Sequence, residues 1–353
     1  MAKTAVAGLD MKLVEIAMAY QRSRVLCAAA RLGVADALKE GERTVQEIAG
    51  SCAANVATLH RLLRTLAAMG VVAQAQRDTF VLTEFGEKLR KDAANSAWPA
   101  IIFWADLLAD NWSSLTECMR TGESAASLRP EIMKRWREEP EGPEIFRAVM
   151  GTSPAESYLP IARAWDFSDA RVVADLGGGG GAMIEAILET FPKVRGMLVD
   201  RPASIDAAKP RFSSGPLADR VQLVATDLSI EVPTGADVHV LKHVLYGYAD
   251  DAAAQILRNC RTALPPDGRI LIVEFVLPEV IDGADPDLEK RLLSDLNMLV
   301  VTGGKERDTL EWRSLAARAA LRCGRIIPVS DDLVHRFHET DHMWRIHNFR
   351  RGF

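Results

Sequence analysis

The chain has 353 residues, of which 48% are hydrophobic and 26% charged, a composition typical of an ordinary globular protein. This composition excludes a largely disordered chain, a collagen-like chain and a disulfide scaffold, and the length predicts roughly two domains. A net charge of −5 gives the chain no general attraction to nucleic acid or to anionic membranes. The five cysteines are scattered without a CxxC pair, and neither a secretory leader nor a membrane-spanning apolar stretch is visible, so we expect a reducing, cytoplasmic location.

The first 95 residues predict a mainly helical segment that ends in a β-hairpin. A capping box, Thr44 with Glu47, opens a short helix over 45–50, and a second helix over 55–69 has a leucine-rich face. Two β-like runs follow, over 71–75 and 79–83. Helix, helix and hairpin is the order of a winged helix, a fold that either binds DNA or serves in packing and dimerisation.

The charge of this segment favours dimerisation. Residues 1–95 hold 13 Lys+Arg and 10 Asp+Glu, a net charge of only +3. The helix that would enter the DNA groove offers His60, Arg61 and Arg64 and is otherwise mostly leucine and alanine. DNA-binding helices usually place more cationic and polar side chains against phosphates. We therefore expect no nucleic-acid partner.

Residues 96–165 form a second helical region, which holds much of the aromatic content of the chain. Aromatic side chains of this kind form a core in most proteins, and the alternative is that they cover a pocket beside the following α/β half. The aromatic residues between 96 and 160 include Trp98, Phe103, Trp104, Trp112, Trp136, Phe146 and Tyr158.

The strongest local signal is a glycine-rich turn between a β-like run and a helix. The run that begins at Arg171 ends in Asp175 and Leu176, glycines occupy 177–181, and 182–189 has helical spacing. In doubly wound sheets such a unit brings a ligand against bare backbone. At this point the ligand can be a dinucleotide or S-adenosylmethionine (SAM).

Polar residues at the ends of later β-like runs narrow this choice. The runs over 196–200, 221–225, 237–241 and 269–273 end in or are followed by Asp200, Asp227-Leu228, Lys242 and Glu274. A carboxylate at Asp200 can accept hydrogen bonds from both ribose hydroxyls of an adenosyl group, and Asp227 with Leu228 can frame an adenine. A nicotinamide oxidoreductase is the weaker alternative, because no hydride-transfer constellation is visible. We predict a Rossmann-like α/β domain over 166–353, with the ligand at the carboxyl ends of the strands.

These segments together resemble the SAM-dependent small-molecule O-methyltransferases of the plant caffeate type and their bacterial antibiotic-pathway relatives. The resemblance covers residues 12–330. The matching segments are Phe146 with Met150 (F-x-x-x-M), 175–181 (D-L-G-G-G-G-G), Asp200-Arg201-Pro202 (D-x-P), Asp227-Leu228, Lys242 and 303–307 (G-G-K-E-R).

The resemblance implies a homodimer whose winged-helix dimerisation domain, over 1–95, precedes a Rossmann-like SAM-binding domain. It implies SAM as cofactor, S-adenosylhomocysteine as product, no metal, and a small aromatic or polyketide-like hydroxylated metabolite of secondary metabolism as acceptor. The implied cofactor-binding residues are Asp175, Gly177, Gly178, Gly179, Asp200, Asp227, Leu228 and Lys242. The candidate substrate contacts are Phe103, Trp104, Phe146, Met150 and Met298.

The chain departs from the family at the catalytic base. Where the family has a histidine flanked by two acids, this chain has Tyr246, with Glu274 and Glu306 as the matching acids. A phenol with a pKa near 10 is a poor base at neutral pH. Three explanations stay open: Tyr246 only positions an acceptor that is already nucleophilic, the acceptor atom is carbon or nitrogen, or the fold keeps SAM for other chemistry. Besides Tyr246, Glu274 and Glu306, His243 is a candidate catalytic residue, because it could replace the missing base. The resemblance favours a structural or cofactor-side role for it.

The tail over 331–353 is unusual because it holds four of the seven histidines. It contains His338-Glu339-Thr340-Asp341-His342, a formal match to the zinc-binding pattern HExxH, but the surrounding α/β pattern is wrong for a zinc protease. The family normally ends in a strand that completes the sheet. Because residues 334–353 are rich in histidine and arginine, we expect a polar helix or an edge segment here instead.

Overall fold

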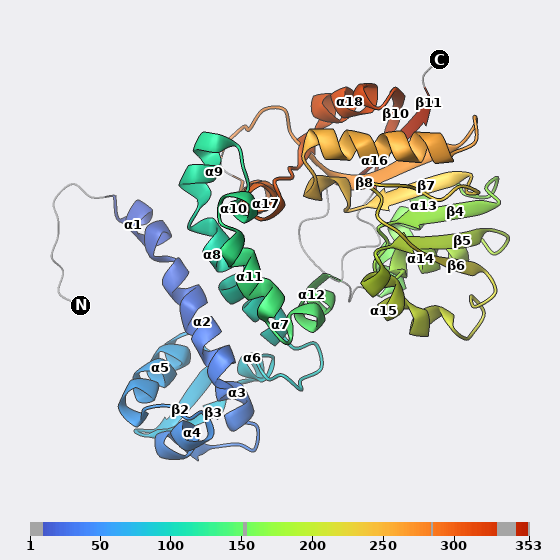
Figure 1. The fold of residues 1–353 in the computed structure, drawn as a ribbon. Helices are drawn as coiled ribbons and strands as arrows, with labels where there is room; N and C mark the ends of the chain where they lie inside the picture. Colours follow the sequence, from blue (N-terminus) through green and yellow to red (C-terminus); the bar gives the residue numbers. More distant parts are fainter. Residues whose placement is uncertain (1–9, 151–153, 284, 330–343, 352–353) are drawn as a thin grey trace. The chain divides into compact units, whose positions relative to one another are not determined.

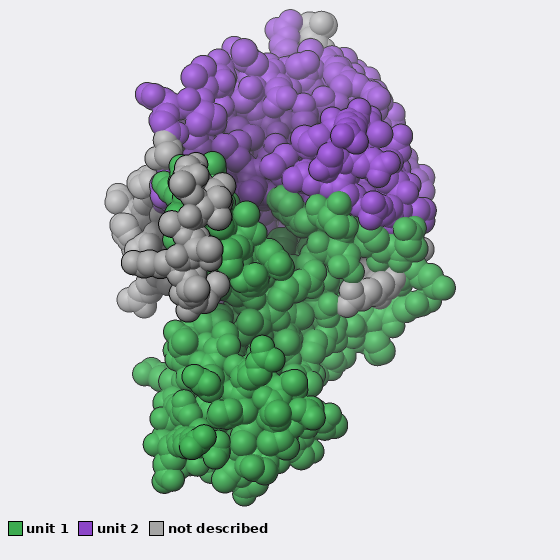
Figure 2. Space-filling view, turned by 90° about the vertical axis from the view of Figure 1, so that its left-hand side faces the viewer, with its two compact units in different colours: residues 1–113, 131–150 green, residues 114–130, 151–353 purple. Residues whose placement is uncertain are grey.

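The computed structural model describes residues 10–150, 154–283, 285–329 and 344–351. The chain divides into two compact units, which Figure 2 distinguishes by colour: residues 1–113 with 131–150, and residues 114–130 with 151–353. Each helix within the described residues is too short or too polar to cross a membrane.

The first unit is mainly helical and carries a small sheet. Its sheet is antiparallel, with strand order β1-β3-β2 (Arg43–Thr44, Thr79–Leu82 and Val72–Gln76). Its helices are α1 (Met11–Met18), α2 (Tyr20–Leu32), α3 (Val34–Ala37), α4 (Val45–Ser51), α5 (Val56–Ala68), α6 (Glu84–Glu87), α7 (Trp98–Ile102), the π-helix η1 (Phe103–Leu107), α8 (Ala109–Trp112), α11 (Pro130–Glu138) and α12 (Gly142–Met150).

The expected order of helix, helix and hairpin is confirmed in this unit. The Thr44 hydroxyl accepts a hydrogen bond from the backbone N–H of Glu47, and the Glu47 carboxylate accepts one from the backbone N–H of Thr44, which completes the capping box of α4. The Asn55 side chain caps α5 by accepting a hydrogen bond from the backbone N–H of Thr58. The helix α5 buries Leu59, Leu63 and Leu66, because leucines at these spacings fall on one face.

The second unit is a mixed sheet covered by helices on both faces (Figure 1). Strand order is β10-β11-β8-β7-β4-β5-β6, and β9 pairs with β8 beside this path. The strands are β4 (Val172–Leu176), β5 (Arg195–Asp200), β6 (Val221–Ala225), β7 (Val238–Lys242), β8 (Arg269–Leu277), β9 (Arg307–Asp308), β10 (Leu321–Pro328) and β11 (Trp344–Arg351). Strands β4 to β8 pair in parallel, whereas β11 runs antiparallel to both of its neighbours.

Helices connect and cover these strands. They are α9 (Leu115–Thr121), α10 (Ala125–Leu128), the 3₁₀ helix η2 (Ala155–Tyr158), α13 (Leu159–Ala164), α14 (Ala182–Thr190), α15 (Pro202–Phe212), the 3₁₀ turn η3 (Leu245–Gly247), α16 (Asp250–Ala263), α17 (Pro286–Thr302) and α18 (Thr309–Arg318). One core lies between the sheet and α16 with α18, and a second lies between the opposite face and α13, α14 and α15. Because both faces are covered, the parallel strands are mainly apolar, although β7 also buries His239.

Two expectations are corrected here. The last described segment is neither a helix nor an edge: β11 lies inside the sheet, paired with β10 on one side and β8 on the other, and it buries His347 and Phe349. Glu274 does not end its strand, because β8 continues through Phe275 to Leu277 and this end pairs with β9. The HExxH match over 338–342 lies outside the described residues.

Candidate cofactor and acceptor site

The site is organised at the carboxyl end of β4. From β4 the chain builds outward through β5 and β6 on one side, and later through β7 and β8 on the other. The loops that leave β4 and β7 therefore diverge to opposite sides. In open α/β sheets this switch point is where ligands bind.

The glycine turn after β4 needs glycine for two distinct reasons. Gly177, Gly179 and Gly181 have φ of 72°, 56° and 80°, in the left-handed region that other residues avoid. Gly178 has no such φ, but a Cβ there would lie 2.5 Å from Cγ of Asp175 and 2.5 Å from Cδ1 of Leu198. Around Gly179, by contrast, a Cβ would meet no described atom within 4 Å. The turn is thus closely packed beneath and open at Gly179.

Asp175 supports this turn from inside the sheet. Its side chain is buried, and Oδ2 accepts a hydrogen bond of 3.2 Å from the backbone N–H of Ile184 in the first turn of α14. Burial, together with the charge of Asp200, raises the pKa of Asp175 to about 7, against the opposing charge of Lys242. Its Oδ1 is buried and has no hydrogen-bond partner among the described residues.

Asp200 joins the glycine turn to the end of β5. Its Oδ2 accepts a hydrogen bond of 2.8 Å from the N–H of Gly179, and its Oδ1 accepts one of 2.6 Å from the N–H of Arg201. A carboxylate can accept about four hydrogen bonds, so these two contacts leave capacity on both oxygens. Two backbone donors thus hold this half-buried side chain in place.

Asp227 and Leu228 follow β6 and behave differently from each other. Both the backbone N–H and the hydroxyl of Ser229 donate to Oδ1 of Asp227, at 2.9 and 2.6 Å. These hydrogen bonds lower the pKa of the Asp227 carboxyl, so it is ionised at neutral pH. Leu228 is buried, and its carbonyl accepts from the side-chain amide of Asn259.

Lys242 and His243 leave the end of β7. The Lys242 ammonium lies 4.6 Å from the centroid of the Tyr158 ring. His243 has φ of 52°, and its ring packs against Tyr246 and Phe275 with centroids 5.3 and 5.1 Å apart. Burial, with the nearby charge of Lys242, lowers the pKa of His243 well below its usual value. The imidazole is therefore neutral at pH 7 and a weak base.

Tyr246 lies in the short turn η3 beside two carboxyl groups. Burial, followed by the charges of Glu274 and Glu306, raises the pKa of its phenol well above the usual range. The hydroxyl is therefore protonated at neutral pH and can donate a hydrogen bond, but it cannot serve as a base.

Glu274 and Glu306 are both buried, and the negative charge of Glu306 disfavours ionisation of Glu274. Oε1 of Glu274 accepts hydrogen bonds from the N–H groups of Val244 (2.9 Å) and Leu245 (3.0 Å). Burial and the charge of Glu306 raise the pKa of Glu274 to about 8. Burial and Asp295 raise the pKa of Glu306 to about 7. Oε2 of each is buried and has no hydrogen-bond partner within the described part of the chain.

Four of the five predicted substrate contacts belong to the first unit, and three of them, Phe103, Trp104 and Phe146, form an aromatic cluster. Phe103 is buried and packs edge-on against Trp104, with centroids 4.9 Å apart, while the Phe146 ring lies 6.2 Å from Phe103. Trp104, Phe146 and Met150 are about half exposed. Met298 belongs to the second unit, half-buried on α17.

Four residues of the acceptor region received no role from the sequence. The fully buried Arg307 and the partly exposed Asp250 form an ion pair of 2.9 Å beside η3, and the Asp295 carboxylate accepts from the backbone N–H of Glu306. The guanidinium of Arg291 lies 4.0 Å from the Phe275 ring centroid. Arg307 ends the G-G-K-E-R segment, so that motif was a usable signal, whereas no sequence pattern singles out the other three.

Two family models match this chain. The family described as O-methyltransferase domain matches residues 137–322, and the family described as O-methyltransferase dimerisation domain matches residues 14–92.

Among curated proteins, the chain is similar to bacterial methyltransferases. It is 32% identical over 327 residues to phenazine O-methyltransferase PhzM of Lysobacter antibioticus, covering 92% of this chain and 94% of that protein. It is 34% identical over 311 residues to the mitomycin biosynthesis 6-O-methyltransferase of Streptomyces lavendulae, covering 87% of each. The 8-amino-8-demethylriboflavin N,N-dimethyltransferase of Streptomyces davaonensis is 33% identical over 340 residues, with 93% and 94% covered.

Among solved structures, the chain is again similar to methyltransferases. Mitomycin 7-O-methyltransferase MmcR has a TM-score of 0.82 at 31% identity, covering 97% of this chain and 98% of that chain. The O-methyltransferase NcsB1 from neocarzinostatin biosynthesis, solved with SAM and 2-hydroxy-5-methyl naphthoic acid, has a TM-score of 0.76 at 30% identity, with 94% and 96% covered.

Proposed function

Because the chain belongs to the O-methyltransferase family and is a SAM-dependent methyltransferase, we propose that it methylates a hydroxyl group of a small aromatic or polyketide-like metabolite. The observation that carries the cofactor side of this proposal is the hydrogen bond from the Gly179 N–H to Asp200. It fixes a carboxylate with spare acceptor capacity beside the open part of a glycine turn, at the switch point of the sheet.

The residues present fit SAM. Asp200 would hold the ribose hydroxyls, and Asp227 with Leu228 would hold the adenine. Gly177 to Gly179 would allow close approach of the ligand to the backbone, with Asp175 supporting them from beneath and Lys242 beside them. SAM, when bound, supplies a methyl group on a positively charged sulfur and leaves as S-adenosylhomocysteine.

On the acceptor side, we assign Tyr246 a positioning role. A protonated, buried phenol can hold the acceptor oxygen by a hydrogen bond. Alignment of the reacting groups can lower the activation barrier of such a transfer by roughly 7–11 kcal/mol. The buried Oε2 atoms of Glu274 and Glu306 are the better proton acceptors, since a base works best when its pKa lies near the operating pH. A phenolic hydroxyl that is already acidic suits such a site best.

The remaining assignments follow the same line. Phe103, Trp104, Phe146, Met150 and Met298 would contact the acceptor as apolar surface, and His243 would act as a neutral packing group beside Tyr246. We also propose a homodimer formed through the first unit, in secondary metabolism. The low positive charge of residues 1–95 supports this role for the unit over DNA binding.

The cofactor assignment is tested by calorimetric titration with SAM and S-adenosylhomocysteine. Asp200→Asn keeps one acceptor oxygen for Gly179 but removes the charge, so we expect affinity to fall by at least about tenfold, or ~1.4 kcal/mol. Asp206→Asn is the matched control, because Asp206 is exposed on α15, where its carboxylate accepts a hydrogen bond from the Lys209 ammonium. Equal affinity in both variants would remove the ribose assignment.

The reaction is tested by product mass after incubation with SAM. The acceptor panel comprises dihydroxynaphthoic acids, simple phenols, aryl amines and activated carbon acids. Methylation of phenols, without methylation of the amines or carbon acids, is the expected result. Transfer to amines alone, with the phenols inert, would replace the O-methyltransferase assignment by N-methylation.

A further inference from the structure

The turn that carries Tyr246 is held by an arginine from a distant part of the sequence. Arg307, in β9, is fully buried. Its Nη1 donates to the carbonyl of Leu245 at 3.0 Å, and its Nη2 donates to the carbonyl of Tyr248 at 2.9 Å. One guanidinium thus binds a carbonyl on each side of Tyr246.

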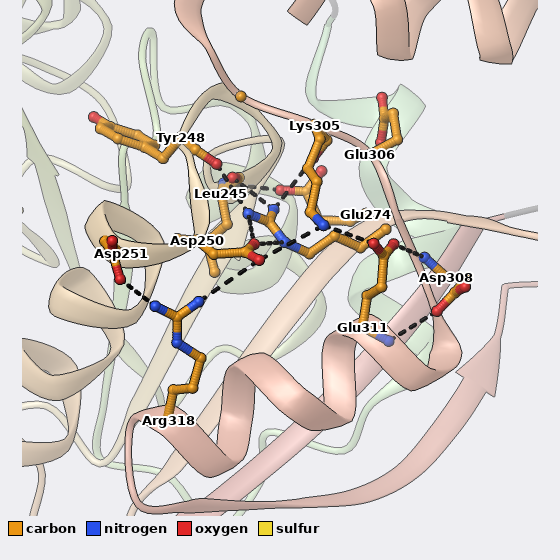
Figure 3. A network of polar contacts seen from close by, with 12 residues as sticks. Leu245, Tyr248, Asp250, Asp251, Glu274, Lys305, Glu306, Asp308, Glu311 and Arg318 are labelled. Carbon is orange, nitrogen blue, oxygen red and sulfur yellow. Dashed lines mark hydrogen bonds and ion pairs between the residues drawn. The ribbon is translucent and has the colours of Figure 1, made fainter. Parts of the chain in front are cut away.

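Glu274 binds the N–H groups of the same turn. Its carboxylate accepts hydrogen bonds from the N–H groups of Val244 and Leu245, whereas the guanidinium of Arg307 donates to the carbonyls of the turn. Figure 3 shows Leu245, Tyr248 and Asp250 meeting in this network, with Glu274 close by. Two strands, β8 and β9, therefore determine together where the backbone of Tyr246 lies.

Gly304 adds a third restraint. A Cβ at this position would lie 2.5 Å from the carbonyl carbon of Gly247, 2.7 Å from the Tyr248 nitrogen, and closer still to the Tyr246 carbonyl oxygen. The backbone just before Arg307 is therefore in direct contact with the turn. Only a residue without a side chain fits there.

Burying a guanidinium is costly, and stability alone does not require it. An apolar replacement of a buried ion pair is often neutral or stabilising. Here the charge is compensated by Asp250, whose Oδ1 accepts from Nε and Nη2 of Arg307 at 3.1 and 2.9 Å. What an apolar residue cannot supply is a set of donors in fixed geometry for the carbonyls on either side of Tyr246.

We propose that Arg307 is a positioning residue that fixes the Tyr246 hydroxyl by binding the carbonyls of Leu245 and Tyr248. This inference rests on the proposed acceptor site, because Tyr246 is the group that is positioned. Arg307 acts on the reaction through the turn, while its positive charge also lies beside Glu306 and opposes the rise in the pKa of that carboxyl.

Arg307→Lys separates geometry from charge. Lysine keeps the positive charge beside Glu306 but is a single flexible ammonium, so it cannot bind both carbonyls and Asp250 in the same fork-like arrangement. The matched control is Arg318→Lys, because Arg318 also faces Asp250, at 3.6 Å, but is exposed. Figure 3 shows Arg318 reaching the network from α18.

The readout is fluorine NMR of protein labelled with 3-fluorotyrosine. The chain has four tyrosines, so four resonances are expected, and Tyr246→Phe identifies one of them. Arg307→Lys should shift or broaden the resonances of Tyr246 and Tyr248 and leave those of Tyr20 and Tyr158 in place. Arg318→Lys should leave all four in place. An unmoved Tyr246 resonance in folded Arg307→Lys would overturn the proposal.

Gly304→Ala is the second variant, in case Arg307→Lys does not fold. Its methyl group would push against the backbone of Tyr246 to Tyr248 and displace the turn, so it should move the same two resonances. Unmoved resonances would again overturn the proposal.

SAM titration of the wild type and the variants separates the proposed function from the proposed role of Arg307. If the wild type fails to bind SAM, the proposed function fails, while the fluorine spectra still decide the role of Arg307. If Arg307→Lys moves all four resonances, Arg307 has a general structural role and the proposal fails.

Discussion

At the scale of single residues, the acceptor region is defined by carboxyl groups that burial keeps partly protonated. Glu274 has a pKa of about 8 and Glu306 a pKa of about 7, whereas glutamate in an unfolded chain titrates near roughly 4.3. The folded chain therefore binds more protons than the unfolded chain between these values. The stability that each group contributes is fully present below about pH 4 and is lost as the pH rises through its folded pKa.

This linkage predicts the pH dependence of a single variant. Glu274→Gln keeps an oxygen that accepts hydrogen bonds from Val244 and Leu245 but cannot ionise. Its free energy of unfolding therefore lacks the decrease that ionisation of Glu274 causes in the wild type as the pH rises. We expect its melting temperature, relative to the wild type, to rise by at least about 3 °C between pH 5 and pH 9. Scanning calorimetry at a fixed heating rate measures this difference.

The control for this measurement is Glu289→Gln, at an exposed position of α17. Its melting temperature should follow that of the wild type across the whole range. A constant difference between Glu274→Gln and the wild type from pH 5 to pH 9 would contradict the raised pKa of Glu274.

At the scale of elements, the parallel strands could be predicted from the sequence almost to the residue. The run over 221–225 coincides with β6, because a parallel strand is typically a short, mainly apolar run bounded by turn residues, and this holds even for β6, which lies at the edge of the sheet. β8 was predicted too short, since Glu274 reads as a strand end in the sequence but is buried within the strand. A pattern of residue types does not show that neighbouring backbone amides satisfy a carboxylate.

The prediction for the last strand was wrong for a related reason. β11 mixes arginine, histidine and asparagine with apolar residues, which reads as a polar segment. Yet His347 is fully buried, with its ring 5.1 Å from that of Trp312 on α18. Likewise, the sequence grouped Glu306 and Arg307 in one motif but could not show that Arg307 binds the turn at 245–248, which lies about 60 positions away.

The place of β11 in the sheet predicts a large effect of truncating its core side chain. Phe349 is fully buried and lies opposite Ile270 of β8 and Cys323 of β10. Phe349→Ala should lower the free energy of unfolding by about 3–5 kcal/mol, measured by urea denaturation. Leu310→Ala, which removes an exposed side chain from α18, should change it by less than about 0.5 kcal/mol. Equal effects would mean that residues 344–351 lie outside the core.

At the scale of the whole molecule, the sheet gathers chemistry from a long stretch of sequence. The glycine turn, Asp200 and Lys242 come from three different strand ends, and Glu274 with Arg307 adds a fourth and a fifth strand. Asp200, Glu274 and Arg307 are each held by hydrogen bonds to backbone groups of another element. Rigid support of this kind is what a transfer reaction that depends on alignment requires.

The exposed apolar face of the first helix supports the proposed homodimer. The helix α1 has eight residues, none of them buried, and Leu13 and Ile16 are 66% and 64% exposed. Large apolar side chains that are so exposed on one helix are typical of a surface that packs against a partner. Together with the match of residues 14–92 to a dimerisation domain, this exposure indicates a second copy of the chain as the partner of α1.

Light scattering after size-exclusion chromatography tests this arrangement. The double variant Leu13→Asp/Ile16→Asp places two charges on the apolar face of α1, and burial of unpaired charges in an interface is costly. We expect a wild type with the mass of two chains and a variant that dissociates to one at micromolar concentration. Val280→Asp, at a site that is 78% exposed in the second unit, should stay dimeric. A dimeric double variant would mean that α1 is not at the interface.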